Sequence, residues 1–272
     1  MIDFWVALSH QSFLQQALLT GLLASLGCGL IGPFVVVKRI AFLAGGIAHS
    51  VLAGMGAAVY FGFNPLTGAL VAAVLAALLI GTVRLYNQER EDTTIGAVWA
   101  IGMAIGILFI SQTPGYTTDL MSFLFGNILL TPTREIIFMA LLDLLLLLIV
   151  LLFYRQFVAV AFDEEFARLR GVPVVFFYQL LLVLVAVTVV LMIQVVGLIL
   201  VIALLTLPAA VAGHWTRSIA GMMLLATLLG SLITTSGLAL SYAPDLPAGP
   251  TMILLAGAVY LGSLVVQRLV RR

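Results

Sequence analysis

The side chain best suited to metal chemistry is His49, which lies inside the apolar run Ala44–Ser50. A neutral imidazole is a common ligand of divalent metal ions. On a helix, the face that carries this histidine also carries three small residues, Gly45, Ala53 and Gly56. Small residues leave room for a small solute or let another helix approach closely. His49 is therefore either a metal ligand or a histidine hydrogen-bonded across a helix interface.

Asp143 is the second ionisable group that stands inside an apolar run, Leu141–Leu144. Such groups within membrane segments are candidate functional residues by default. A carboxylate there must face the interior of a helix bundle. It either belongs to a transport path, makes an interhelical hydrogen bond or stays protonated. The two other histidines, His10 and His214, are expected at surfaces or interfaces.

The polar segment Phe162–Pro173 predicts a short helix with a defined end. Asp163 can cap its N-terminus, acids fill the first turn and arginines the last. Gly171 stands where a C-terminal glycine belongs, and Pro173 prevents continuation. We expect a cytoplasmic helix over about residues 163–171.

One face of this helix is apolar, with Phe162, Phe166 and Leu169 at helical spacing. It either rests in the lipid headgroups or docks a cytoplasmic partner. The only lysine, Lys38, is not in a phosphate-binding loop, and no acidic cluster could hold Mg²⁺ and phosphate. If the chain serves a pump, that pump needs a separate ATPase. This need favours the docking of a cytoplasmic partner on the apolar face. Phe166 and Leu169 would fill a groove on the ATPase, while Arg168 and Arg170 pair with its acids.

Composition places these residues in a membrane. The chain has 272 residues, of which 63% are hydrophobic and 8% charged, and its mean hydropathy is +1.25. Soluble domains are about 45–50% apolar and about 25% charged. This excludes a soluble enzyme, a nucleic-acid binder and a disordered regulator. The single cysteine, Cys28, cannot form an internal disulfide.

Charged residues and turn formers divide the chain into apolar segments long enough to cross a bilayer of about 30 Å. The expected spans lie near residues 13–37, 41–61, 66–84, 94–111, 134–154, 174–193, 197–213, 219–241 and 250–267. All are expected to be helical, because the leucine runs do not alternate as barrel strands do. The seventh holds Pro208 and could be broken, so eight spans are the alternative. Asp92 is expected to cap the fourth.

Lysines and arginines predict the orientation, because they concentrate in cytoplasmic loops. The chain has twelve lysines and arginines. With the N-terminus outside and nine spans, all of them except Arg134 lie in the cytoplasm. The sequence thus predicts an all-α polytopic protein of an inner or plasma membrane, with an outer N-terminus and a cytoplasmic C-terminus. We expect one transmembrane domain over residues 1–272. The N-terminus lacks the basic region of a cleavable signal.

Together these features resemble the integral-membrane permease of a zinc, manganese and iron uptake ABC transporter. Five stretches carry the resemblance over essentially the whole chain: Gly46–Gly54, Glu91–Gly96, Asp119–Asn127, Gly197–Ala210 and Pro247–Pro250. The resemblance implies the type II fold of vitamin B12 importers. It also implies a homodimer, a pair of ATPases and an extracytoplasmic metal-binding protein. The ATPase-coupling residues it implies are Asp163, Glu164, Phe166, Arg168, Leu169, Arg170 and Gly171.

One position departs from the family pattern. Family members commonly carry an aspartate one turn before the histidine of the second span, and this chain has Gly45 there. A carboxylate and an imidazole together suit Zn²⁺ or Mn²⁺, whereas a lone imidazole is a poor trap. Either His49 holds metal weakly, another oxygen donor such as Asp143 substitutes, or the substrate differs.

The function expected is ATP-driven movement of Zn²⁺, Mn²⁺ or Fe²⁺ into the cytoplasm. The metal is the substrate, so we expect no cofactor and no catalytic residue in this chain. The alternatives are a permease for a metal chelate (siderophore, haem or cobalamin) and an ion-coupled secondary carrier. A carrier would show matched repeats with discontinuous helices, and no repeat is visible in the sequence. An intramembrane zinc protease would need a motif such as HExxH near His49.

Overall fold

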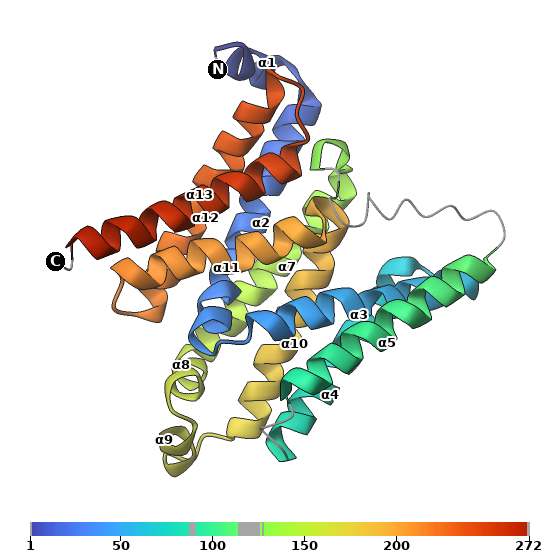
Figure 1. The fold of residues 1–272 in the computed structure, drawn as a ribbon, viewed down its shortest axis with the longest axis vertical. Helices are drawn as coiled ribbons and strands as arrows, with labels where there is room; N and C mark the ends of the chain where they lie inside the picture. Colours follow the sequence, from blue (N-terminus) through green and yellow to red (C-terminus); the bar gives the residue numbers. More distant parts are fainter. Residues whose placement is uncertain (1, 87–90, 114–125, 127, 271–272) are drawn as a thin grey trace. The chain divides into compact units, whose positions relative to one another are not determined.

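The computed structural model describes residues 2–86, 91–113, 126 and 128–270, and secondary structure in these ranges is entirely helical (Figure 1). The helices are α1 (Ile2–His10), α2 (Ser12–Val37), α3 (Ala41–Tyr60), α4 (Pro65–Tyr86), α5 (Glu91–Gln112), η2 (Ile128–Leu130), α7 (Thr133–Leu152), α8 (Tyr154–Phe162), α9 (Glu164–Leu169), α10 (Val174–Val196), α11 (Leu198–Trp215), α12 (Ile219–Tyr242) and α13 (Ala248–Val270).

Nine helices in the described part of the chain are long and apolar enough to cross a membrane, namely α2 to α5, α7 and α10 to α13. They match the nine expected spans to within a few residues at each end. The doubtful seventh span is α11, an 18-residue helix that continues past Pro208. A single residue, Gly197, separates it from α10. Its φ of +80° suits glycine, which has no Cβ to clash in the left-handed region.

Other details differ from the expectation. Helix α5 begins at Glu91, so Asp92 lies inside its first turn and the prediction that Asp92 caps it is wrong. A carboxylate in a first turn still interacts favourably with the helix dipole. The sequence also did not predict α1 or α8. Helix α8 follows α7 after one residue and carries the amphipathic sequence YRQFVAVAF.

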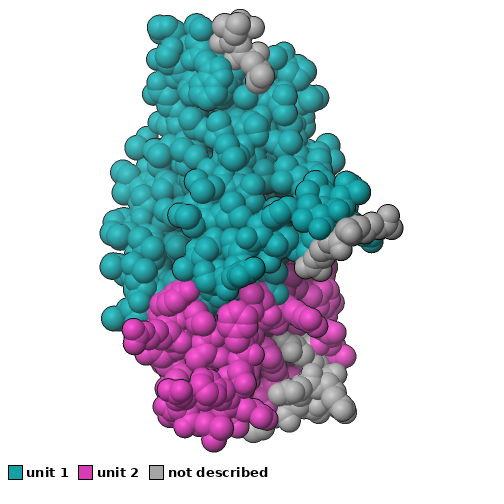
Figure 2. Space-filling model, turned by 90° about the vertical axis from the view of Figure 1, so that its left-hand side faces the viewer, with its two compact units in different colours: residues 1–36, 121–152, 191–272 teal, residues 37–120, 153–190 magenta. Residues whose placement is uncertain are grey.

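The chain divides into two compact units, coloured separately in Figure 2. Unit 1 comprises residues 1–36, 121–152 and 191–272, and unit 2 comprises residues 37–120 and 153–190. The expected single domain over the whole chain stays a prediction.

In unit 1, α2 packs closely against α11 and α12 through glycines. A Cβ on Gly29 would lie 2.8 Å from the backbone nitrogen of Thr227, and one on Gly32 would overlap the carbonyl oxygen of Leu205. In lipid, where apolar contact alone drives little association, such backbone proximity contributes to the attraction between helices.

In unit 2, α3 packs against both α4 and α5. Gly54 faces the backbone of Gly68 in α4, and Gly56 faces the backbone of Gly106 in α5, with no room for a side chain at either crossing. The small residues of α3 therefore serve in part to bring three helices together.

Candidate functional site: the His49 helix, Asp143 and the α9 helix

His49 lies on α3 and is half-buried. Its imidazole stacks on the indole of Trp99 in α5, with ring centroids 4.2 Å apart and planes 8° from parallel. The indole N–H of Trp99 donates a hydrogen bond to the sulfur of Met103 at 3.1 Å. Within the described residues, His49 makes this stack and no hydrogen bond. Its contact with the neighbouring helix is thus a ring stack, and its ring nitrogens are not engaged by those residues.

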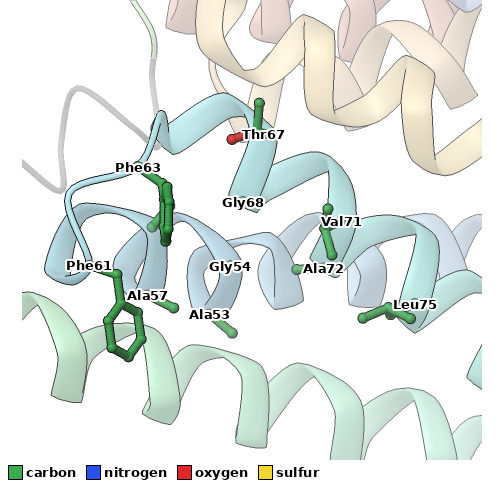
Figure 3. A pocket seen from close by; sticks show the side chains of 11 residues that line it. Ala53, Gly54, Ala57, Phe61, Phe63, Thr67, Gly68, Val71, Ala72 and Leu75 are labelled. Carbon is green, nitrogen blue, oxygen red and sulfur yellow. The ribbon is translucent and has the colours of Figure 1, made fainter.

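A groove of about 440 Å³ opens between α3 and α4 (Figure 3). Ala53, which lines it, lies about one helical turn after His49 in α3. Small residues of α3, including Ala53 and Ala57, form its floor, and Phe61 and Phe63 stand at one end. Thr67 supplies the only polar side chain of its lining. A surface of this kind offers no set of ligands for a metal ion, so the groove is not a metal site.

Asp143 lies on α7 and faces the interior of unit 1, as expected, with 2% of its surface exposed. Neither carboxylate oxygen has a hydrogen-bonding partner among the described residues. A Cβ on Gly27 of α2 would lie 2.5 Å from its Oδ1, so α2 has no side chain where the carboxyl group sits. An ionised carboxylate without partners is costly in such a place, and the protonated alternative fits this environment better than an interhelical hydrogen bond.

The described residues contain no group of three or more histidine, cysteine, aspartate or glutamate side chains able to hold a metal ion. His49 belongs to unit 2 and Asp143 to unit 1. Neither side chain therefore belongs to a group of three or more such residues in the described part of the chain.

Helix α9 is capped as the sequence predicts. The Asp163 side chain accepts a hydrogen bond from the backbone N–H of Phe166 at 2.9 Å. At the other end Gly171 has a φ of +76°, a region that other residues resist. Pro173 then separates α9 from α10. Both ends of this six-residue helix are thus fixed by local sequence.

Phe166 and Leu169 lie in α9, but Phe162 does not share a helix face with them as predicted, because it ends α8 and the extended Asp163 separates the two helices. The exposed fractions are 66% for Phe162, 49% for Phe166 and 88% for Leu169. The guanidinium of Arg170 lies 4.9 Å from the centre of the Phe166 ring, and Arg168 is exposed. Three exposed apolar side chains flanked by two arginines suit a protein contact better than water.

Glu164 was also predicted to couple to an ATPase, but its side chain contacts other helices of its own chain. Its carboxylate forms an ion pair with Lys38, just before α3, and lies 3.4 Å from the guanidinium of Arg84 in α4. Arg84 also donates a hydrogen bond to the Tyr178 hydroxyl of α10. The sequence did not indicate this cluster, because its members are far apart along the chain.

The stretches near 126, 197 and 247 meet in unit 1. Gly126, with a φ of +63°, lies against the backbone of Gly197, where a side chain would not fit. Together with Pro247 and Pro250, Gly126 lines a cavity of about 400 Å³. The other residues of the stretch Asp119–Asn127 lie outside the residues that the structure describes.

Comparison with known proteins places these features in a family. The model of the ABC 3 transport family matches residues 10–267. The chain belongs to the ABC 3 transport family. It is thus a transport subunit and a multi-pass membrane protein, and the resemblance found in the sequence is confirmed.

Relatives with names that refer to metal transport match this ABC 3 family member over nearly all of its length. It is 40% identical over 272 residues to a probable metal transport system membrane protein of Chlamydia pneumoniae, covering 96% of this chain and 93% of that one. It is 33% identical over 257 residues to the manganese transport system membrane protein MntC of Halalkalibacterium halodurans, covering 94% and 88%.

A solved structure shows the same fold. PsaBC from Streptococcus pneumoniae, determined in complex with Fab, superposes with a TM-score of 0.86 at 32% identity, covering 97% of this chain and 95% of that one. The expected fold, an all-helical ABC permease, is therefore confirmed.

Proposed function

We propose that this ABC 3 family permease moves divalent metal ions into the cytoplasm, with Mn²⁺ as the first candidate and Zn²⁺ and Fe²⁺ as the others. The observation that carries the proposal is the match over 94% of the chain to a protein named for manganese transport. His49 supports it, because a half-buried imidazole whose nitrogens make no hydrogen bond with the described residues can bind such an ion briefly. Transport requires binding weak enough for release.

The energy for transport comes from separate cytoplasmic ATPase subunits that bind the exposed face of α9. Two copies of this permease form the membrane part, and an extracytoplasmic protein delivers the metal. The N-terminus is outside and the C-terminus in the cytoplasm, which puts α9 on the cytoplasmic side. The support for this orientation is the distribution of lysine and arginine, with Arg134 alone on the outer side.

The experiment is uptake into vesicles that contain the purified permease and its ATPase, with the metal-binding protein added on the side that delivers metal. We expect Mn²⁺ to accumulate only when ATP is supplied on the ATPase side. Accumulation without ATP would indicate a secondary carrier. Transport of a metal chelate but not of the free ion would indicate a chelate permease.

His49→Ala tests the proposed metal path in the same vesicles. Mn²⁺ uptake should fall while dimer assembly and ATPase binding stay at the wild-type level. Unchanged uptake would mean that His49 only packs against Trp99 and that the metal follows another path.

A further inference from the structure

We infer that Glu164 is the positioning residue that links movement of α9 to α3, the helix that carries His49. This inference rests on the proposed function. Its observation is the cluster of Lys38, Arg84, Glu164 and Tyr178, all in unit 2. We refer to these four residues as the Glu164 cluster.

The Glu164 carboxylate is directed toward its own chain rather than toward a partner. Its Oε1 accepts from both Lys38 Nζ and Arg84 Nη2. The exposed fractions of the side chains are 8% for Lys38, 19% for Arg84 and 29% for Glu164. The cluster is thus largely shielded from water. Charge interactions in such a shielded place are stronger and less screened than at a surface.

The cluster links α9 to α4 and to the segment before α3 at one carboxylate, and Arg84 links α4 to α10. Lys38 lies three residues before α3, and Arg84 lies in the last turn of α4. The guanidinium of Arg84 also lies 4.4 Å from the centre of the Tyr178 ring in α10, and Lys38 Nζ lies 5.7 Å from it. A displacement of α9 therefore acts on the start of α3 and the end of α4 together.

Stability alone does not account for such a cluster. Buried ion pairs stabilise folds little compared with apolar packing, while loss of one partner leaves an unpaired buried charge. Removal of the Glu164 charge takes from Lys38 and Arg84 the carboxylate oxygen that both of them contact. This makes the cluster an effective mechanical link between α9 and its neighbours.

Helix α3 extends this link to the metal path. His49 lies eight residues after Ala41, the first residue of α3, which corresponds to about 12 Å along a helix at a rise of about 1.5 Å per residue. A shift at Lys38 is therefore transmitted along a rigid element to His49. By contrast, Phe166 and Leu169 point outward for docking, so α9 uses different side chains for the two tasks.

The test measures Mn²⁺ taken up per ATP hydrolysed by the complete transporter in vesicles. The variants are Glu164→Gln, Lys38→Gln, the double variant and the charge-conserving Lys38→Arg. Glu165→Gln is the matched control, because it makes the same change at the exposed neighbouring residue.

We expect Glu164→Gln to assemble with the ATPase and to hydrolyse ATP within about twofold of wild type, while the ratio of uptake to hydrolysis falls at least tenfold. Lys38→Gln should lower the ratio several-fold. The double variant should be no worse than Glu164→Gln, because residues that act as one unit are not additive. Lys38→Arg and Glu165→Gln should keep the wild-type ratio.

A wild-type ratio of uptake to hydrolysis in Glu164→Gln would overturn the inference. Equal losses of hydrolysis and uptake would also overturn it, because they would indicate that Glu164 serves to dock the ATPase. If Glu164→Gln does not assemble with the ATPase, Lys38→Gln tests the inference instead, because it keeps the Glu164–Arg84 ion pair. A wild-type ratio of uptake to hydrolysis in Lys38→Gln would then overturn the inference. Failure of the proposed function is distinct, because the wild-type transporter would then take up no Mn²⁺ at all.

Discussion

Replacing both Phe166 and Leu169 with aspartate should strongly weaken binding of the ATPase. Phe166 is 49% exposed and Leu169 is 88% exposed, so docking would bury about half of the first side chain and nearly all of the second. Full burial of such a side chain contributes about 1.5–3 kcal/mol. Together they contribute about 2–4 kcal/mol, and each 1.4 kcal/mol is about tenfold in affinity. The affinity for the ATPase should therefore fall by about 30- to 1,000-fold.

The assay is co-purification and equilibrium binding of the ATPase with permease held in lipid nanodiscs. The matched control is Phe63→Asp, which places an aspartate on a phenylalanine that is 69% exposed between α3 and α4. The control should bind the ATPase as the wild type does. Wild-type binding by the Phe166→Asp/Leu169→Asp variant would refute the assignment of α9 as the docking helix.

Three further predictions address the rest of the site. Gly171→Val should destabilise the end of α9 by about 1–2 kcal/mol, because its φ of +76° is unfavourable for a branched residue; thermal unfolding of the complex and ATPase binding should both decline. Asp143→Asn should leave the melting temperature unchanged, because a neutral group replaces a carboxyl without hydrogen-bonding partners among the described residues; a loss of uptake at unchanged stability would instead place Asp143 on the metal path. Gly27→Ala should cost about 1–3 kcal/mol in the free energy of unfolding, because its methyl group would lie 2.5 Å from Asp143 Oδ1 and 2.9 Å from Met192 Cε; an unfolding midpoint equal to that of the wild type would contradict this packing.

The membrane helices could be predicted because a bilayer imposes a simple rule on sequence. Each span needs about 20 apolar residues, and polar residues mark its ends. The rule does not predict α1 or α8, because both are too short to cross a bilayer. It also gives helix ends only to within a few residues, which is why Asp92 falls inside α5 instead of capping it.

The candidate site was predictable where the signal is local. The cap at Asp163 and the left-handed Gly171 depend on neighbours within a few residues, and both are as expected. The direction of Glu164 depends on Lys38 and Arg84, which lie 126 and 80 residues away in the chain. The stack of His49 on Trp99 likewise depends on how two helices cross. Spacing along one helix cannot reveal either contact.

The crossings of α3 bear on what the Glu164 cluster could move. Gly54 and Gly56 bring α3 into contact with the backbones of α4 and α5, so the three helices meet without intervening side chains. Close-packed interfaces of this kind do not deform continuously. A displacement at Lys38 and Arg84 should therefore move α3 and α4 together and change the surroundings of His49 as a whole. On this reasoning, enlarging Gly54 to leucine would reduce uptake through altered packing while the Lys38–Glu164 ion pair stays intact.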